Sequence, residues 1–246
     1  METRDLPSAN FDLRPAGRAI DMLLLHYTGM PSAAGALARL RDAAAKVSAH
    51  YVVDEDGTVY RLVREEHRAW HAGVASWAGA TDINARSIGI ELVNPGHEWG
   101  YRPFPEAQMA ALVGLARAIL GRHRIPAERV LAHSDVAPSR RRDPGELFDW
   151  RRLAANGIGI VADAAPPSGA AATLARGDRG PEIRALRAKL ASFGYGVGVG
   201  AAYDGLTETV VRAFQRHHRP SAVDGRADRA TQDALDDLLR RRRAPG

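Results

Sequence analysis

Three polar residues stand where a metal site could form. His26 ends the apolar run that starts at Met22, His133 follows the apolar run Val130–Ala132, and Asp143 lies in the segment after that second run. Two imidazoles and one carboxylate give a zinc ion three protein ligands and leave its fourth position for water, as a hydrolase requires. The chain has no cysteine, so His, Asp or Glu must supply the ligands of any metal. Spacing alone is weak support, because nine histidines allow many other triples and a histidine at a strand end can also be a capped core residue.

A carboxylate interrupts a further apolar run. Glu91 lies within Ile88–Val93, where burial of an ionised side chain is costly unless it has a partner or a chemical purpose. Next to an activated water, such a carboxylate can accept a proton and later give one to a leaving amine. The alternative is a glutamate that faces solvent on an edge strand or pairs with an arginine.

A sheet is needed to bring these side chains together. The apolar runs read as buried strands, and they alternate with helical patterns at about Ser32–Ala45 and between Pro105 and His123, which indicates an α/β domain. The segments Tyr51–Val53 and Thr58–Val63 flank the turn residues Asp54–Gly57 and predict a strand pair.

A second domain is predicted beyond residue 172. Residues 164–172 are rich in Ala, Pro and Gly, as linkers are, so residues 1–163 and 173–246 form the two expected domains. Three helical patterns follow, at about Pro181–Phe193, Leu206–His217 and Arg229–Arg241, and they predict a small three-helix bundle. All residues given chemical roles precede the linker, so we expect the bundle to act as a flexible tether that leaves the chemistry untouched.

Composition excludes several classes of protein. With 45% hydrophobic and 26% charged residues, the 246-residue chain is globular and long enough for one sizeable core and a smaller one. The net charge of +5 suits acidic partners, but no groove-reading motif accompanies it, so no nucleic acid partner is expected. No apolar stretch reaches membrane-spanning length and the N-terminus has no secretory pattern, so no integral membrane segment is expected.

Several separated short motifs of the sequence resemble those of a known family. They are Leu23–Thr28, Ser87–Leu92, Ala132–Pro138 and Arg142–Gly145. In this order they resemble the type 2 N-acetylmuramoyl-L-alanine amidases, zinc enzymes related to phage amidases and peptidoglycan recognition proteins. The resemblance spans about residues 22–150 and implies a mixed sheet flanked by helices. It also implies cleavage of the amide bond between N-acetylmuramic acid, or its anhydro form, and L-alanine.

The resemblance assigns roles to individual residues. It makes His26, His133 and Asp143 the zinc ligands and Glu91 the catalytic carboxylate. Arg141 matches a position where many relatives carry Lys; because Arg stays charged at any working pH, we expect it to act on charge alone, and a solvated basic loop is the alternative.

Three more residues match words that the family uses along its substrate groove. Trp70 could stack on a sugar face, with core packing as its alternative, while His71 and Asn84 could hydrogen-bond to amides and hydroxyls. His50 is expected to be structural or to support a ligand rather than to bind metal.

The C-terminal pattern resembles the three-helix peptidoglycan-binding domain of wall hydrolases, through Tyr203–Thr207 and Phe214-Gln215. Peptidoglycan or a muropeptide is therefore the expected partner, and the oligomeric state is left open. The binding module favours the cell envelope if a leader has been removed, and the missing leader favours the cytoplasm.

Two other functions compete with this reading. A recognition module of the same fold would bind muropeptides without cutting them, although an intact group of three ligands argues against it. A glycoside hydrolase would need two opposed carboxylates, and only Glu91 is well placed for such a role.

Overall fold

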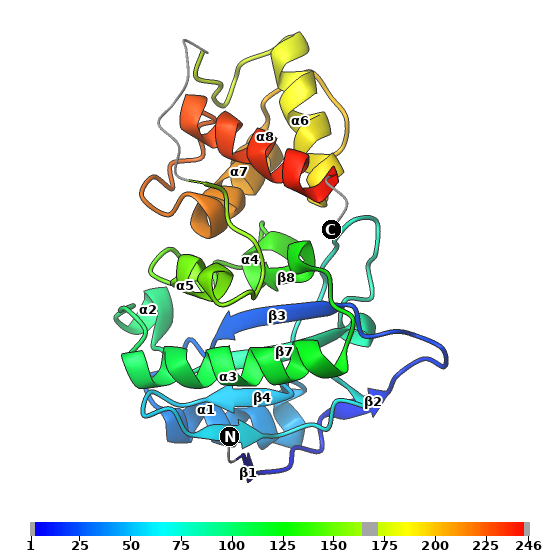
Figure 1. Cartoon of the computed structure of the whole chain (residues 1–246), viewed down its shortest axis with the longest axis vertical. Coiled ribbons are helices and arrows are strands. Elements are labelled where there is room, and N and C mark those ends of the chain that lie inside the picture. The colour runs from blue at the N-terminus through cyan, green and yellow to red at the C-terminus, as the bar shows by residue number, and fades with distance from the viewer. Residues whose placement is uncertain (1–2, 164–171, 244–246) are drawn as a thin grey trace.

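The computed structural model in Figure 1 consists of two units stacked along the long axis of the molecule. The structure describes residues 3–163 and 172–243. The first unit holds the sheets and the second holds three helices. The predicted linker, residues 164–172, lies outside the described residues except for Ala172.

The central sheet is mixed, as expected, with the strand order β1-β5-β4-β7-β3-β8. Its strands are β1 (Arg4–Asp5), β3 (Met22–Tyr27), β4 (Tyr51–Val53), β5 (Val59–Arg61), β7 (Ser87–Leu92) and β8 (Val130–Ala132). Only the β4–β5 pair is antiparallel, and it is the predicted hairpin. A separate antiparallel pair joins β2 (Phe11–Leu13) to β6 (His67–Ala69). Because β3, β7 and β8 run parallel, their carboxyl ends meet at one edge of the sheet.

The first unit contains the two predicted helices, one of them shorter than expected, and three short helices that were not predicted. They are α1 (Ala33–Arg41), α2 (Gly96–Trp99), α3 (Glu106–Arg122), α4 (His133–Val136) and α5 (Trp150–Ala155), with 3₁₀ turns at Ala43–Ala45, Asn84–Arg86 and Ala127–Arg129. The helix expected over Ser32–Ala45 ends at Arg41. Asp42 adopts an extended conformation with ψ of 116° and its side chain accepts a hydrogen bond from the Ala44 amide, which starts the 3₁₀ turn.

The two faces of the sheet are buried against different partners. Leu23 and Leu25 of β3 point to the face that α3 covers, where Leu112 and Ile119 pack against them. Met22 and Leu24 point to the opposite face, as alternation along a strand requires. His26 continues that second set and Glu91 shares its face, because Ile88, Ile90 and Leu92 belong to the α3 side.

The second unit contains the three predicted helices. They are α6 (Pro181–Phe193), α7 (Gly205–His218) and α8 (Arg229–Arg243). Pro181 stands in the first turn of α6, and the Asp204 side chain caps α7 by accepting a hydrogen bond from the Thr207 amide. Within residues 3–163 and 172–243, no helix is both long and apolar enough to cross a bilayer.

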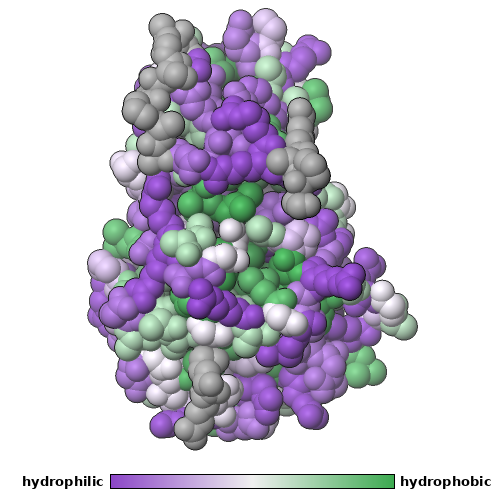
Figure 2. Space-filling model, viewed as in Figure 1, coloured by the Kyte–Doolittle hydropathy of each residue, from purple (hydrophilic) through white to green (hydrophobic). Residues whose placement is uncertain are grey.

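The two units share one hydrophobic core, so the expectation of a freely tethered bundle is wrong. A single cluster joins Met22, Leu24 and Trp77 of the first unit to Phe193 and Tyr195 of the second. The Trp77 and Tyr195 rings lie edge to face with centroids 4.9 Å apart. Hydrophobic residues also gather on the surface at the level where the units meet (Figure 2). Burial of this apolar surface holds the units in one arrangement.

We predict that Gly194→Ala destabilises the junction between the units. Gly194 and Gly177 both have positive φ, at 137° and 101°, so both alanine variants carry a backbone cost. Only at Gly194 would the new methyl group meet the Trp77 ring, 2.4 Å away, whereas nothing lies within 4 Å at Gly177. The free energy of unfolding should fall by about 1–3 kcal/mol more for Gly194→Ala than for Gly177→Ala, measured by urea denaturation. Equal losses would contradict a close-packed junction.

Candidate functional site

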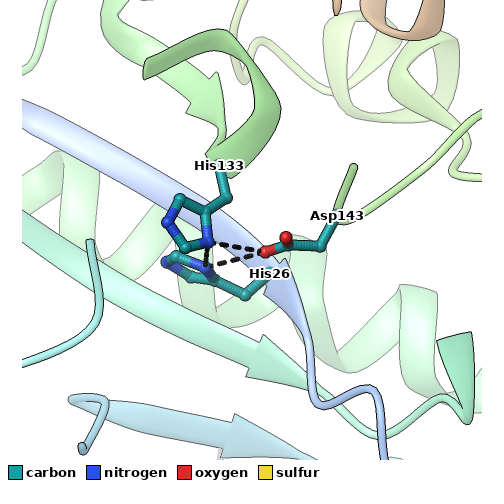
Figure 3. Close-up of side chains that lie close together, drawn as sticks. All are labelled: His26, His133 and Asp143. Carbon is teal, nitrogen blue, oxygen red and sulfur yellow. Dashed lines mark hydrogen bonds and ion pairs between the residues drawn. The ribbon is translucent and has the colours of Figure 1, made fainter. Parts of the chain in front are cut away.

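Three donor atoms from separate elements meet at the carboxyl edge of the sheet (Figure 3). His26 lies on β3, His133 opens α4 directly after β8, and Asp143 follows α4. The two Nδ1 atoms are 2.9 Å apart, and Asp143 Oδ2 lies 3.0 Å from that of His26 and 2.9 Å from that of His133. All three side chains are buried, and they form the one group in the described residues that could hold a metal ion. The sequence prediction that these residues come together agrees with this geometry.

A hydrogen bond fixes the ring of His133 so that its Nδ1 can act as a metal ligand. Its Nε2 lies 3.0 Å from the carbonyl oxygen of Ala72, which can only accept a hydrogen bond. The proton therefore resides on Nε2, and the Nδ1 lone pair faces the other two donor atoms. A backbone carbonyl in this position orients a ligand and sets its tautomer.

The ring of His26 is fixed by a longer chain of hydrogen bonds. Ser87 donates its hydroxyl proton to the Ile83 carbonyl at 2.7 Å, so its oxygen accepts from His71 Nε2 at 3.2 Å. His71 then has its lone pair on Nδ1, which accepts from His26 Nε2 at 3.1 Å. This order of donors leaves the His26 lone pair on Nδ1, directed at the site.

The electrostatics favour the protonation states that bind a metal. Burial and the nearby His133 lower the pKa of His26 to about 4, so its imidazole is neutral at neutral pH. Burial opposes ionisation of Asp143, but the charged and hydrogen-bond-donating forms of His133 and His26 outweigh burial and hold the pKa of that carboxyl well below its usual range. Neutral imidazoles and an ionised carboxylate are the forms that ligate divalent metals.

Glu91 stands beside this group on the same face of the sheet. It pairs in register with His26, and its Oε2 is buried with no hydrogen-bond partner among the described residues. Burial and the Asp143 carboxylate raise the pKa of Glu91 well above its ordinary value, while Arg141 opposes the rise. Since β7 lies between β4 and β3, the alternative of a solvent-facing edge strand is wrong.

A cavity of about 460 Å³ opens over these residues. Its lining includes Glu91, His133, Asp143 and two of the predicted groove residues, Trp70 and His71. Trp70 is half-buried and donates from Nε1 to Asp12 at 2.7 Å, which holds its ring at the cavity wall and differs from the core-packing alternative. The His71 ring both lines the cavity and holds His26.

The three adjacent arginines play unequal parts. Arg140 donates to the carbonyls of Ala72 and Val74, so it ties its loop to the loop that fixes His133. Arg141 and Arg142 are exposed and line the cavity, and their side chains make no hydrogen bond within the described part of the chain. The positive charge of Arg141 lowers the pKa of Glu91, which partly offsets the effect of burial.

Asn84 does not line the cavity. Its Oδ1 accepts hydrogen bonds from the amides of His71 at 3.2 Å and Ala72 at 2.8 Å, the two residues that hold the two imidazoles. The hypothesis that Asn84 contacts substrate therefore receives no support from its position. His50 is likewise buried away from the donor group, where its Nδ1 accepts from the Gly89 amide at 3.0 Å, as expected of a structural residue.

Sequence reasoning missed Tyr27 and His97, which also line the cavity. The Tyr27 hydroxyl lies 2.9 Å from His97 Nδ1, and the His97 ring stacks on Tyr101 with centroids 4.3 Å apart. His97 follows β7 at the same edge of the sheet where β3 ends, so its position after an apolar run was a usable signal.

Comparisons with known proteins agree with this fold. Residues 16–146 match the family described as N-acetylmuramoyl-L-alanine amidase, and residues 179–235 match a peptidoglycan binding domain. The N-acetylmuramoyl-L-alanine amidase AmiD of Escherichia coli (strain K12) is 39% identical over 89% of this chain and 82% of that protein. The 1,6-anhydro-N-acetylmuramyl-L-alanine amidase AmpD of Haemophilus influenzae is 31% identical over 61% of this chain and 90% of its own length.

Solved structures show the same arrangement. The complex of Escherichia coli AmiD with anhydro-N-acetylmuramic acid-L-Ala-D-gamma-Glu-L-Lys superposes with a TM-score of 0.79 and 36% identity, over 93% of this chain and 92% of that one. The complex of Pseudomonas aeruginosa AmpDh3 with anhydromuramic pentapeptide gives 0.77 and 30%, over 94% and 95% of the two chains.

The fold and the buried His-His-Asp group define an amidase, and the chain belongs to the N-acetylmuramoyl-L-alanine amidase family. It hydrolyses the amide bond between N-acetylmuramic acid, or its anhydro form, and L-alanine. This activity replaces the alternatives of a non-cutting recognition module and of a glycoside hydrolase.

We predict that Asn84→Ala lowers stability and turnover but leaves KM unchanged. Loss of Oδ1 strands two buried amides, at a cost of about 1–3 kcal/mol in the free energy of unfolding, and loosens the residues that hold His26 and His133. Asn10→Ala is the matched control, because Asn10 is also buried and bonds two backbone carbonyls away from the imidazoles. The Asn10→Ala variant should have a lower free energy of unfolding and an unchanged kcat. A raised KM with unchanged stability would instead make Asn84 a substrate contact.

Proposed function

We propose that this amidase is a zinc enzyme in which His26, His133 and Asp143 hold the ion and Glu91 is the general base. The set of ligand atoms supports the proposal: two imidazole nitrogens and one carboxylate oxygen converge in a buried site, with no thiolate present. The observation that carries it is the pair of hydrogen-bond arrangements that leaves both Nδ1 lone pairs directed at one place, where Asp143 Oδ2 also lies. When bound, zinc supplies Lewis acidity that polarises the scissile carbonyl and makes water nucleophilic near pH 7.

The residues of the chain supply the proton transfers. Glu91 accepts the proton of the attacking water at its unpartnered Oε2 and delivers it to the nitrogen of the leaving L-alanine. A raised pKa suits the first step, because a stronger base takes the proton from water more readily. Arg141 carries a fixed positive charge at the rim, where it stabilises the developing oxyanion or a substrate carboxylate.

The cavity wall supports binding of a sugar-peptide fragment. We propose that the Trp70 ring stacks on a sugar face and that His71, besides holding His26, borders the bound amide. We divide the chain into a catalytic domain at residues 1–163 and a peptidoglycan-binding domain at residues 173–246, joined by residues 164–172. The match of the second domain to a peptidoglycan binding family supports work at the cell envelope.

The metal proposal predicts one zinc ion per chain and activity that a chelator abolishes and added zinc restores. His26→Ala and His133→Ala should each reduce bound zinc to background, because each removes one of three protein donors. His123→Ala is a suitable control, since His123 pairs with Glu65 away from the cavity. Metal analysis of purified variants and muropeptide digestion followed by mass spectrometry would check this. An active preparation without zinc would rule the mechanism out.

The base proposal predicts that Glu91→Gln retains zinc and loses about 10²–10⁴-fold in kcat. In the wild type, activity should fall as pH drops through the pKa of Glu91, because only the carboxylate accepts a proton, and this midpoint should lie above the ordinary value of about 4.3.

Arg141→Met should move that midpoint to higher pH, because the arginine charge favours the ionised carboxylate. Arg142→Met, one residue further at the same rim, is the control and should leave the midpoint in place. An unshifted acid limb in Arg141→Met would remove Arg141 from this role.

A further inference from the structure

Two neighbouring residues of α7 contact the chain directly after two of the proposed zinc ligands. His217 bonds to Asp135, two residues beyond His133, and Arg216 faces Glu146, three residues beyond Asp143. We infer that the C-terminal bundle is a positioning part of the amidase site, in which His217 and Tyr195 fix the segment that carries His133 and Asp143. This inference rests on the proposed metal-binding role of these two side chains.

Asp135 is the centre of the contact. Its carboxylate is fully buried and accepts hydrogen bonds from the Ala132 amide at 2.8 Å, the Tyr195 hydroxyl at 2.7 Å and His217 Nδ1 at 2.7 Å. Two of the three donors belong to the bundle. A buried carboxylate is stable only when its oxygens are satisfied, so α4 and the bundle depend on each other for this position.

The helix that begins with His133 cannot hold itself in place. α4 has four residues, and an isolated turn of helix is unstable because its nucleation cost exceeds its hydrogen-bond gain. The His217 ring also stacks on Trp150 with centroids 3.7 Å apart, so it is clamped between α4 and α5. Its own orientation is therefore set by packing as well as by its bond to Asp135.

The second contact reaches the cavity. Arg216 Nε lies 3.7 Å from Glu146 Oε2, and the Glu146 carboxylate is 3.2 Å from His97 Nε2. His97 and its partner Tyr27 line the cavity. The bundle thus contacts the site through the segments that follow both ligands, whereas an anchor that only binds wall polymer would need neither contact.

The test compares full-length variants that remove single donors. Tyr195→Phe removes one hydroxyl and keeps the packing against Trp77, and His217→Leu removes the other donor. Tyr203→Phe is the matched control, because the equally buried Tyr203 hydroxyl donates to the Gly225 carbonyl inside the bundle. His217→Asn is the rescue variant, since its amide can donate from about the position of Nδ1.

Three readouts are taken on each variant: zinc affinity by competition with a chromogenic chelator, the visible spectrum of the cobalt-substituted protein, and kcat and KM on a soluble anhydro-muramyl peptide. Tyr195→Phe and His217→Leu should weaken zinc binding about tenfold, the lower end for residues that orient a ligand, alter the cobalt spectrum and lower kcat. Tyr203→Phe should change none of these, and His217→Asn should recover most of the loss.

Wild-type zinc affinity, cobalt spectrum and kcat in both Tyr195→Phe and His217→Leu would overturn the inference, as would an equal loss in Tyr203→Phe. If the wild-type protein itself binds no zinc, the metal proposal fails separately. The kcat ratios of Tyr195→Phe and Tyr203→Phe then decide whether the bundle positions the site.

Discussion

The structure around the site depends on one constraint: two buried imidazoles must keep their Nδ1 lone pairs directed at the place where the Asp143 carboxylate also converges. The protein meets it by giving each Nε2 proton a fixed acceptor, the Ala72 carbonyl for His133 and His71 for His26. Both acceptors belong to adjacent residues of one loop. That loop must therefore hold its place against β3 and β8 to within a hydrogen-bond length, and much of the nearby polar structure serves this purpose.

The loop is held from two directions. Asn84 Oδ1 accepts hydrogen bonds from the two backbone amides of the loop, those of His71 and Ala72. Arg14 in turn donates to the carbonyls of Asn84 at 3.0 Å and Ser87 at 2.8 Å, which anchors the start of β7. On the other side, the His71 ring lies against Gly89 of β7. A Cβ at this position would come within 2.5 Å of the ring. Burial and the Arg14 charge lower the pKa of the neighbouring His50 to about 3, so it stays neutral and adds no competing charge beneath the site.

The C-terminal bundle also helps to hold the residues of the site in place. Hydrophobic contacts between the units, centred on Trp77, give the junction its stability but little directionality. The buried bonds from Tyr195 and His217 to Asp135 add direction, because a misaligned junction would leave a carboxylate unsatisfied. A unit that resembles a wall-binding module is in this way also built into the support of the reaction site.

The sequence by itself determined the strands that end near His26, Glu91 and His133 and the helices of the bundle, because apolar runs, amphipathic spacing and capping residues are local patterns. Its motifs also predicted that His26, His133 and Asp143 come together, although a separation of 107 residues between the two histidines carries no distance information. Only the tertiary structure decided that Asn84 braces a loop, that His71 orients His26, and that the bundle is docked. Each of these depends on groups distant in sequence, as much as 82 residues for Asp135 and His217, which meet only when packed elements bring donor and acceptor within reach.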